Sequence, residues 1–154
     1  MTANPYQQYK RKKYETQDQT KLLLMLYEGA IKFCKQAKIA IENDDPIEKN
    51  NKLQRAQDVI HELIDSLDTD NGGEVADNLL RLYEYMLRRL IKANIKQDTE
   101  IVDEVLDLLN NLYQGWQGAA KKVRENKGSK QSNKNNFNSA QTQQQRGGAI
   151  NIEG

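Results

Sequence analysis

The chain has very little of the chemistry from which enzyme and metal sites are usually assembled. Its 154 residues include one cysteine, one histidine and two prolines. A single cysteine, Cys34, can form neither an intrachain disulfide nor a cysteine-based metal cluster. The scarcity of proline, together with many residues of good helix propensity, favours an all-α fold. No Ser/His/Asp set, phosphate-binding loop or zinc motif is present. We therefore predict a protein that is not an enzyme and uses no cofactor or metal.

Charge of one sign and long apolar runs are also missing. Lysine and arginine number 23 against 22 aspartates and glutamates, a net charge of +1. Nucleic-acid-binding domains usually carry a basic excess or stripe, so the balance argues against that class. The apolar run 22–26 is far shorter than the roughly 20 residues of a membrane-spanning helix, and the N-terminus has no apolar signal-peptide core. We expect a cytoplasmic protein without membrane insertion.

What the chain does have is helical periodicity. Apolar residues recur at i, i+3 and i+4 in four segments separated by polar breaks. The expected helices cover residues 18–42, 46–67, 74–94 and 99–124. Asp18, Asp45 and Asp98 stand where each can cap a helix, and Pro46 suits a first helical position. Because short connections make consecutive helices antiparallel neighbours, the pattern predicts an antiparallel up-down four-helix bundle over residues 18–124.

The two ends of the chain differ from this middle part. Residues 1–17 form a polar arm with poor helical periodicity. Residues 125–154 are rich in Asn, Gln, Ser, Lys and Gly. Such a composition buries too little apolar surface to offset the loss of chain entropy. We expect a disordered tail there, and so a division into arm (1–17), bundle (18–124) and tail (125–154).

Residues that could bind a metal are few and badly placed for it. We expect His61 to be structural or on the surface, because no Cys or His ligand accompanies it, and Cys34 to be a buried, inert thiol. Four acids share one face of the fourth helix, opposite its apolar stripe. Di-iron bundles instead point Glu residues inward from several helices and add Glu-x-x-His motifs. We expect a solvated face at these four residues: Glu100, Asp103, Glu104 and Asp107.

Other side chains suit contact with a partner protein. Arg88 belongs to a basic patch of the third helix, which either pairs with acids of a neighbouring helix or meets a partner. Tyr113 and Trp116 end the apolar stripe of the fourth helix, where they either pack in the core or anchor a partner at a groove mouth. The remaining candidates lie off the core stripe, near helix ends or in the arm. The partner-binding set is Tyr6, Tyr9, Leu22, Met25, Ile47, Arg88, Ile95, Tyr113 and Trp116.

Several stretches of the chain resemble the flagellin export chaperone family, FliS. They are NPYQQY and LLLMLYEGAIKF in the first half, then GGEVADNL, LYEYMLRRLIKAN and a D…EV…LL…W stretch in the second. Together they cover roughly residues 4–122. The resemblance implies a bundle mainly of four helices, around which the disordered C-terminal segment of flagellin wraps. It also implies delivery of the loaded complex to the export-gate protein FlhA, without use of ATP by the chaperone.

The arm has two possible roles. Interleaved tyrosines and cations can stack on and neutralise single-stranded nucleic acid. Alternatively, Tyr6 and Tyr9 fold back onto the bundle as an apolar plug that fills part of the client groove until loading. The resemblance favours the plug, because NPYxxY looks like the family's N-terminal segment. The family's proline before the first helix is missing here, where residues 16–19 read TQDQ.

Other classes of helical protein stay open at this point. A metal or cofactor carrier lacks its ligand set in this sequence, and an RNA binder lacks the basic excess. A helical adaptor for another secretion or regulatory partner differs from the chaperone only in its client. The free protein either stays monomeric or forms a homodimer through its exposed grooves.

Overall fold

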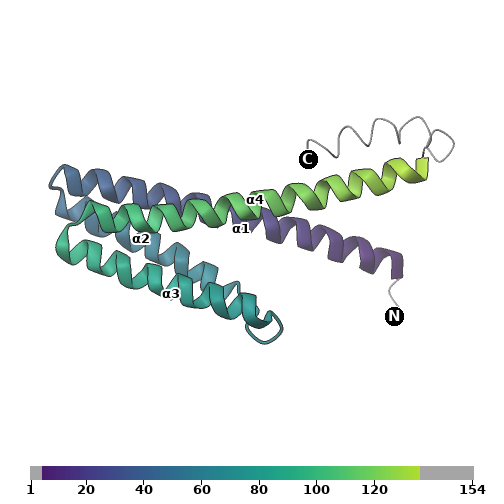
Figure 1. Ribbon diagram of the computed structural model, residues 1–154, viewed down its shortest axis with the longest axis horizontal. Helices are drawn as coiled ribbons and strands as arrows, with labels where there is room; N and C mark the ends of the chain where they lie inside the picture. The colour runs from purple at the N-terminus through teal and green to yellow at the C-terminus, as the bar shows by residue number, and fades with distance from the viewer. Residues whose placement is uncertain (1–4, 136–154) are drawn as a thin grey trace. The chain divides into compact units, whose positions relative to one another are not determined.

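The computed structural model describes residues 5–135, and within that range every regular element is a helix. The helices are α1 (Pro5–Glu42), α2 (Pro46–Asp65), α3 (Gly73–Lys96) and α4 (Thr99–Asn135), as Figure 1 shows. The predicted all-α class is confirmed. The up-down order of the four helices stays a prediction.

Two of the predicted caps are present. The Asp45 carboxylate accepts a hydrogen bond from the Glu48 backbone N–H at 3.1 Å, and Pro46 occupies the first position of α2. The Asp98 carboxylate accepts from the Glu100 backbone N–H at 2.9 Å. Both caps satisfy amide donors that the first helical turn leaves without partners.

The predicted start of the first helix is wrong. α1 begins at Pro5 rather than after Asp18, so the arm is helical from residue 5 on. No proline or glycine follows Pro5 until Gly29, and Gln, Lys, Arg and Glu have good helix propensity. Extending an existing helix also avoids the cost of nucleating a new one. Poor apolar periodicity therefore did not exclude a helix in this segment.

The predicted end of the fourth helix is wrong for a similar reason. α4 continues to Asn135, so residues 125–135 of the predicted tail are helical. Their polarity predicts weak burial but does not prevent backbone hydrogen bonds along a helix already formed. Among the described residues, the chain up to Trp116 forms one compact unit, and the chain from Gln117 on forms a second. The rest of the predicted tail, 136–154, lies outside the described residues, as do residues 1–4.

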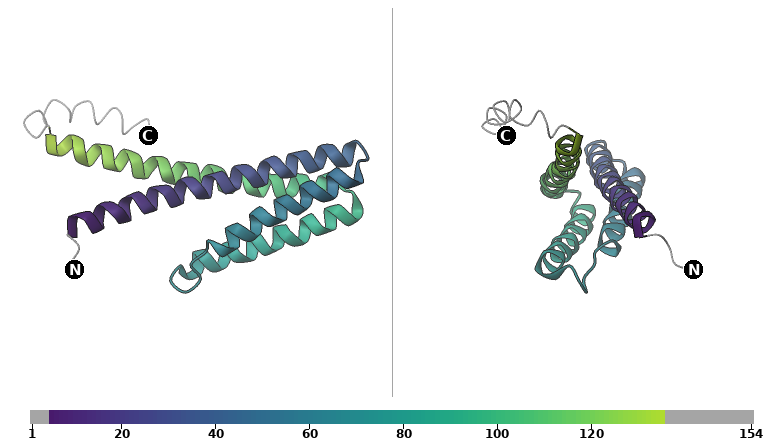
Figure 2. Two further views of the ribbon diagram at one scale, coloured as in Figure 1. Left: turned by 180° about the vertical axis from the view of Figure 1, so that it is seen from behind. Right: turned by 90° about the vertical axis from the view of Figure 1, so that its right-hand side faces the viewer.

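The core of the first unit draws on all four helices. α1 and α2 lie side by side, and so do α2 and α3 (Figure 2). The largest fully buried side chains are Tyr27 and Cys34 from α1; Leu53, Ile60 and Leu63 from α2; Tyr83, Met86 and Leu90 from α3; and Val102, Val105 and Leu109 from α4. Burial of each such aliphatic or aromatic side chain contributes about 1.5–3 kcal/mol.

The connection between α2 and α3 depends on two glycines. A Cβ at Gly72 would press against the Asp68 carbonyl oxygen and lie 2.6 Å from Ala76 Cβ. Gly73 has φ +61, in the left-handed region that side chains rarely adopt. The turn that sends α3 back along α2 therefore requires glycine at both positions.

Candidate partner-binding surface

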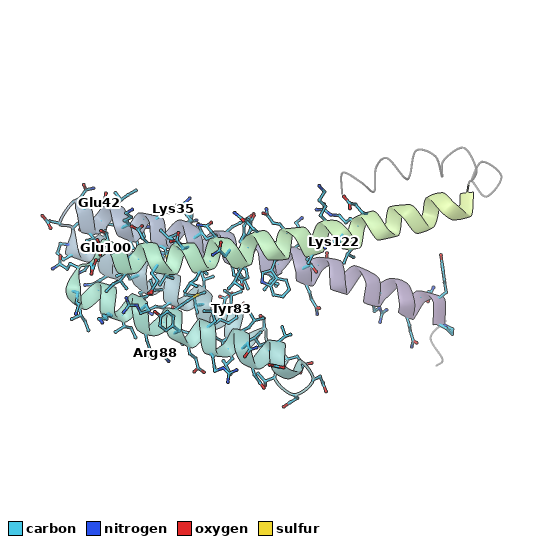
Figure 3. The ribbon with its side chains drawn as sticks, viewed as in Figure 1. Lys35, Glu42, Tyr83, Arg88, Glu100 and Lys122 are labelled. Carbon is cyan, nitrogen blue, oxygen red and sulfur yellow. The ribbon has the colours of Figure 1, made fainter. Side chains whose placement is uncertain are left out.

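Three aromatic residues from three helices form a hydrogen-bonded cluster. The Tyr27 hydroxyl of α1 is paired with the Tyr83 hydroxyl of α3, and their rings lie 6.4 Å apart between centroids. The indole N–H of Trp116 in α4 donates to the Tyr27 hydroxyl at 3.1 Å. Figure 3 labels Tyr83 on α3. Burial raises the pKa of both tyrosines above the ordinary value, because it disfavours the charged phenolate. The cluster is therefore neutral and structural.

Tyr113 and Trp116 are held by the fold rather than left at an open groove mouth. Both are partly buried and pack against the core. The Tyr113 hydroxyl donates to the Glu28 carboxylate, which joins α4 to α1. Of the two alternatives for these side chains, packing against the core agrees with their positions. Their assignment to partner binding stays a prediction.

The basic patch of α3 divides into a paired and an exposed part. Arg89 Nε lies 2.6 Å from Glu104 Oε1, and the Tyr85 hydroxyl donates to Glu104 Oε2 at 2.9 Å. The hydrogen bond from Arg89 is the largest cause of a lowered pKa of Glu104, and the bond from Tyr85 is the next. Arg88 is exposed, with its guanidinium 6.0 Å from the centroid of the Tyr85 ring (Figure 3). Pairing within the protein therefore accounts for Arg89 and leaves Arg88 available to a partner.

The expected solvated face of α4 is only half right. Glu100 and Asp107 are exposed, but Asp103 and Glu104 are partly buried. Asp103 Oδ1 lies 2.9 Å from Lys38 Nζ of α1, while Glu104 bonds α3. The two inner acids flank the apolar stripe on opposite sides, so each faces a neighbouring helix. The packing of three helices, rather than the α4 pattern, decides which acids stay in solvent.

Five of the predicted partner contacts are exposed apolar side chains. Leu22 and Met25 of α1 are 57% and 55% exposed, and Ile47 and Ile95 are 80% and 78% exposed. Ile47 and Ile95 lie at one end of the unit, where Lys49 Nζ of α2 donates to the Asn94 carbonyl of α3 at 3.1 Å. Tyr6 is 63% exposed, which is not the burial a plug requires. The side chain of Tyr9 lies outside the described residues. The candidates therefore occupy separate regions.

Sequence reasoning missed an exposed isoleucine and a half-buried phenylalanine on α1. Ile39 is 55% exposed and was not among the predicted partner contacts. The Phe33 ring is surrounded by the cationic groups of Lys32 at 4.8 Å, Arg55 at 5.8 Å and Lys52 at 5.9 Å from its centroid. A helical wheel centred on Tyr27, Cys34 and Ile41 would have placed Ile39 off the buried stripe. No sequence signal places Lys52 and Arg55 of α2 beside Phe33.

Cys34 and His61 are two side chains that the sequence analysis considered as metal ligands. Cys34 is buried, and burial raises the pKa of its thiol to about 12. His61 is exposed, which agrees with the surface position that was one of its two predicted roles. Among the residues that the structure describes, no cluster of three His, Cys, Asp or Glu side chains could hold a metal ion. Within the same residues, no helix is both long and apolar enough to cross a bilayer.

The described residues form an all-helical fold that leaves several aliphatic side chains exposed to solvent. Residues 2–123 match the family model described as flagellar protein FliS. The flagellar secretion chaperone FliS of Bacillus subtilis is 38% identical over 124 residues, covering 80% of this chain and 92% of that protein. The flagellar secretion chaperone FliSB of Pseudomonas aeruginosa is 41% identical over 98 residues, covering 64% and 78%. FliS of Salmonella typhimurium is 37% identical over 103 residues, covering 66% and 76%.

The match covers most of the chain, from the first turns of α1 through the stretch of α4 that includes Trp116. The chain belongs to the FliS family of flagellar proteins. The matched relatives are named as flagellar secretion chaperones.

Proposed function

We propose that this protein is a cytosolic flagellar export chaperone that binds the disordered C-terminal segment of flagellin. Binding keeps flagellin from polymerising in the cytoplasm, and the loaded complex is delivered to the export-gate protein FlhA. Family membership supports the chaperone class. The observation that carries binding is the set of exposed aliphatic side chains on a folded helical unit, Leu22 and Met25 foremost.

The physical chemistry of a disordered client explains why such side chains are useful. A segment that folds as it binds loses conformational entropy and needs a large buried apolar area in return. Exposed Leu, Ile and Met side chains provide that area, and Met adapts its shape to different neighbours. We propose that the flagellin segment contacts those residues of the predicted set that are exposed in the structure. Among them, Arg88 makes the charged contacts.

We further propose the finer architecture for this unit. Short connections and hydrogen bonds that join α1 to α3 and α4 support an antiparallel up-down bundle over residues 18–124. Residues 1–17 act as the arm, and the free protein pairs as a homodimer through the apolar surface that the client covers. Light scattering before and after client addition tests the last point: the dimer should become a one-to-one complex.

Isothermal titration against a peptide from the C-terminal region of flagellin of the same organism tests the function. One-to-one binding with a large negative heat-capacity change is expected, because apolar surface is buried. A peptide of equal length from the middle of flagellin serves as the control. Two results would favour the alternative, a helical adaptor for another secretion or regulatory partner. One is equal binding of both peptides, and the other is no binding of either peptide by a protein that circular dichroism shows to be folded.

A further inference from the structure

The turn between α2 and α3, residues 66–72, contains an asparagine followed directly by a glycine (Figure 1). Asn71-Gly72 is the only Asn-Gly pair in the sequence, and both residues are exposed to solvent. In such a pair the backbone nitrogen of the glycine can attack the side-chain carbonyl carbon of the asparagine, because glycine has no Cβ to obstruct the approach. The turn therefore carries the position of this chain at which spontaneous deamidation meets the smallest steric barrier.

The reaction takes two steps and consumes only water. First the Gly72 N–H loses its proton to hydroxide, and the nitrogen forms a bond to Asn71 Cγ while the bond from Cγ to Nδ2 breaks and ammonia leaves with a proton from water. Water then opens the resulting succinimide ring at one of its two carbonyl groups. One opening gives aspartate at position 71, and the other gives isoaspartate, in which the main chain runs through the former side chain. Because the first step begins with loss of an amide proton, the rate rises with pH.

Asp68 binds both of the nitrogen atoms that this reaction uses. Its backbone carbonyl accepts the Gly72 N–H at 2.7 Å. Its carboxylate accepts the Asn71 backbone N–H at 3.1 Å and the Asn71 side-chain amide, from Nδ2, at 3.3 Å. The attacking nitrogen of Gly72 and the leaving nitrogen of Asn71 are thus both hydrogen-bond donors to one residue.

These three hydrogen bonds oppose closure of the succinimide ring. A Gly72 nitrogen without its proton would face the lone pairs of the Asp68 carbonyl oxygen instead of donating to them, so the short bond makes deprotonation less favourable. Asn71 also has a bound N–H on each side of its Cα. Turning its main chain toward the geometry of attack breaks at least one of these bonds. The folded turn therefore slows a reaction that its sequence favours.

We propose that Asn71 is a deamidation site that the folded turn protects through Asp68 and that opening of the turn releases. The protecting contacts all lie between residues 68 and 72, so the protection is local. Either product ends it. Aspartate at position 71 lacks the Nδ2 donor and places a second carboxylate beside Asp68. Isoaspartate lengthens the main chain in a turn where a Cβ on Gly72 would already press against Asp68 and where Gly73 has φ +61.

Peptide mapping by mass spectrometry measures the reaction, because deamidation adds one mass unit to the peptide that contains Asn71. The full-length protein is incubated at mildly alkaline pH, once folded and once in urea, and is sampled over time. Asn71 of the folded wild type should deamidate at least about tenfold more slowly than Asn71 of the unfolded chain, since ring closure in the folded turn requires the loss of hydrogen bonds to Asp68.

Asp68→Ala tests the role of the carboxylate. The variant removes two of the three bonds, so Asn71 in the folded variant should deamidate about tenfold faster than in the folded wild type. The matched control is Asp70→Ala, which removes the same charge from the same turn. The Asp70 side chain is exposed and, within the described part of the chain, bonds neither Asn71 nor Gly72. The control should keep a rate close to that of the wild type.

A second control separates opening of the turn from unfolding of the whole protein. Tyr27→Phe removes a hydroxyl that joins three helices and leaves the bonds of Asp68 in place. It lowers global stability, but its folded form should deamidate as slowly as the wild type. Deamidated protein, separated from its parent by ion exchange, should unfold at a lower urea concentration, because the connection between α2 and α3 is weakened.

The outcomes decide the proposal. Equal rates in the folded and the unfolded wild type would show that the turn gives no protection, and would overturn it. Equal acceleration by Asp68→Ala and Asp70→Ala would show an effect of charge alone. Acceleration by Tyr27→Phe as large as that by Asp68→Ala would show that the reaction requires global unfolding. Either of these two results would also overturn local protection by Asp68.

Discussion

The indole of Trp116 and the hydroxyl of Tyr27, separated by 89 positions in the chain, are joined by a hydrogen bond of 3.1 Å. This bond ties the last residue of the first compact unit to the buried face of α1. Tyr27 pairs at the same hydroxyl with Tyr83 of α3. One oxygen atom therefore joins three helices.

Tyr27→Phe should cost about 1–3 kcal/mol of unfolding free energy, because it leaves the Trp116 indole and the Tyr83 hydroxyl without their partner. Urea unfolding followed by circular dichroism measures this cost. Trp116 is the only tryptophan, so its emission should change as well. In Tyr83→Phe the bond between Trp116 and Tyr27 remains, so the emission should stay near that of the wild type. An equal change of emission in both variants would contradict the arrangement described.

The Glu104 carboxylate should make stability depend on pH in acid. Its pKa in the folded protein is lowered, mainly by the hydrogen bond from Arg89. A lowered pKa contributes stability above the unfolded value of about 4.3, and that stability is lost as pH falls through the folded value. The Tm difference between wild type and Glu104→Gln should therefore be largest near neutral pH and shrink below about pH 4. The same difference measured in an Arg89→Gln background should be smaller at every pH, because the main cause is gone.

Gly115→Ala should stabilise the first unit by about 0.5–1 kcal/mol. The position is helical, and a Cβ there would meet nothing within 4 Å. Alanine reduces the conformational freedom of the unfolded chain without a steric cost. The comparison is Gly72→Ala, which should destabilise, since its Cβ would press on Asp68 and Ala76. Urea midpoints measure both, and a loss of stability in Gly115→Ala would mean that this glycine has a neighbour in solution.

The Cys34 thiol should react very slowly in the native protein. It is buried, and its pKa is raised to about 12 by that burial. Since the thiolate is the reactive species, modification by Ellman's reagent at pH 8 should follow global unfolding. Mild urea that unfolds the protein should restore a rate typical of an exposed cysteine. Fast reaction under native conditions would show that α1 opens locally.

Local features of the sequence predicted much of the helical structure. Asp45 and Pro46 cap and start α2 through contacts within one turn, so their roles are visible in the sequence. The burial of Cys34 follows from its position seven residues from both Tyr27 and Ile41, which places all three side chains on one face of the helix. The start of α1 at Pro5 was missed because periodicity reports burial, whereas a polar helix is stabilised by backbone bonds and propensity.

The candidate surface was predicted less well than the helices. Leu22 and Met25 were expected to be exposed, and they are. Ile39 is exposed but was absent from the predicted partner-binding set, and Asp103 and Glu104 were expected in solvent although each pairs with a neighbouring helix. In each case the missing information was the rotation of one helix against its neighbours, which periodicity within a single helix leaves free by several tens of degrees.

The sequence by itself determined the all-α class, the caps of α2 and α4, the shortage of catalytic and metal-binding chemistry, and the motifs that resemble the FliS family. These depend on residues close together in the chain, or on pattern. Only the tertiary structure decided that Trp116 bonds Tyr27, that Arg89 pairs with Glu104 while Arg88 does not, and that Phe33 lies beside Lys52 and Arg55 of α2. These depend on how four helices pack at once, because each buried face limits the rotation and register of the others.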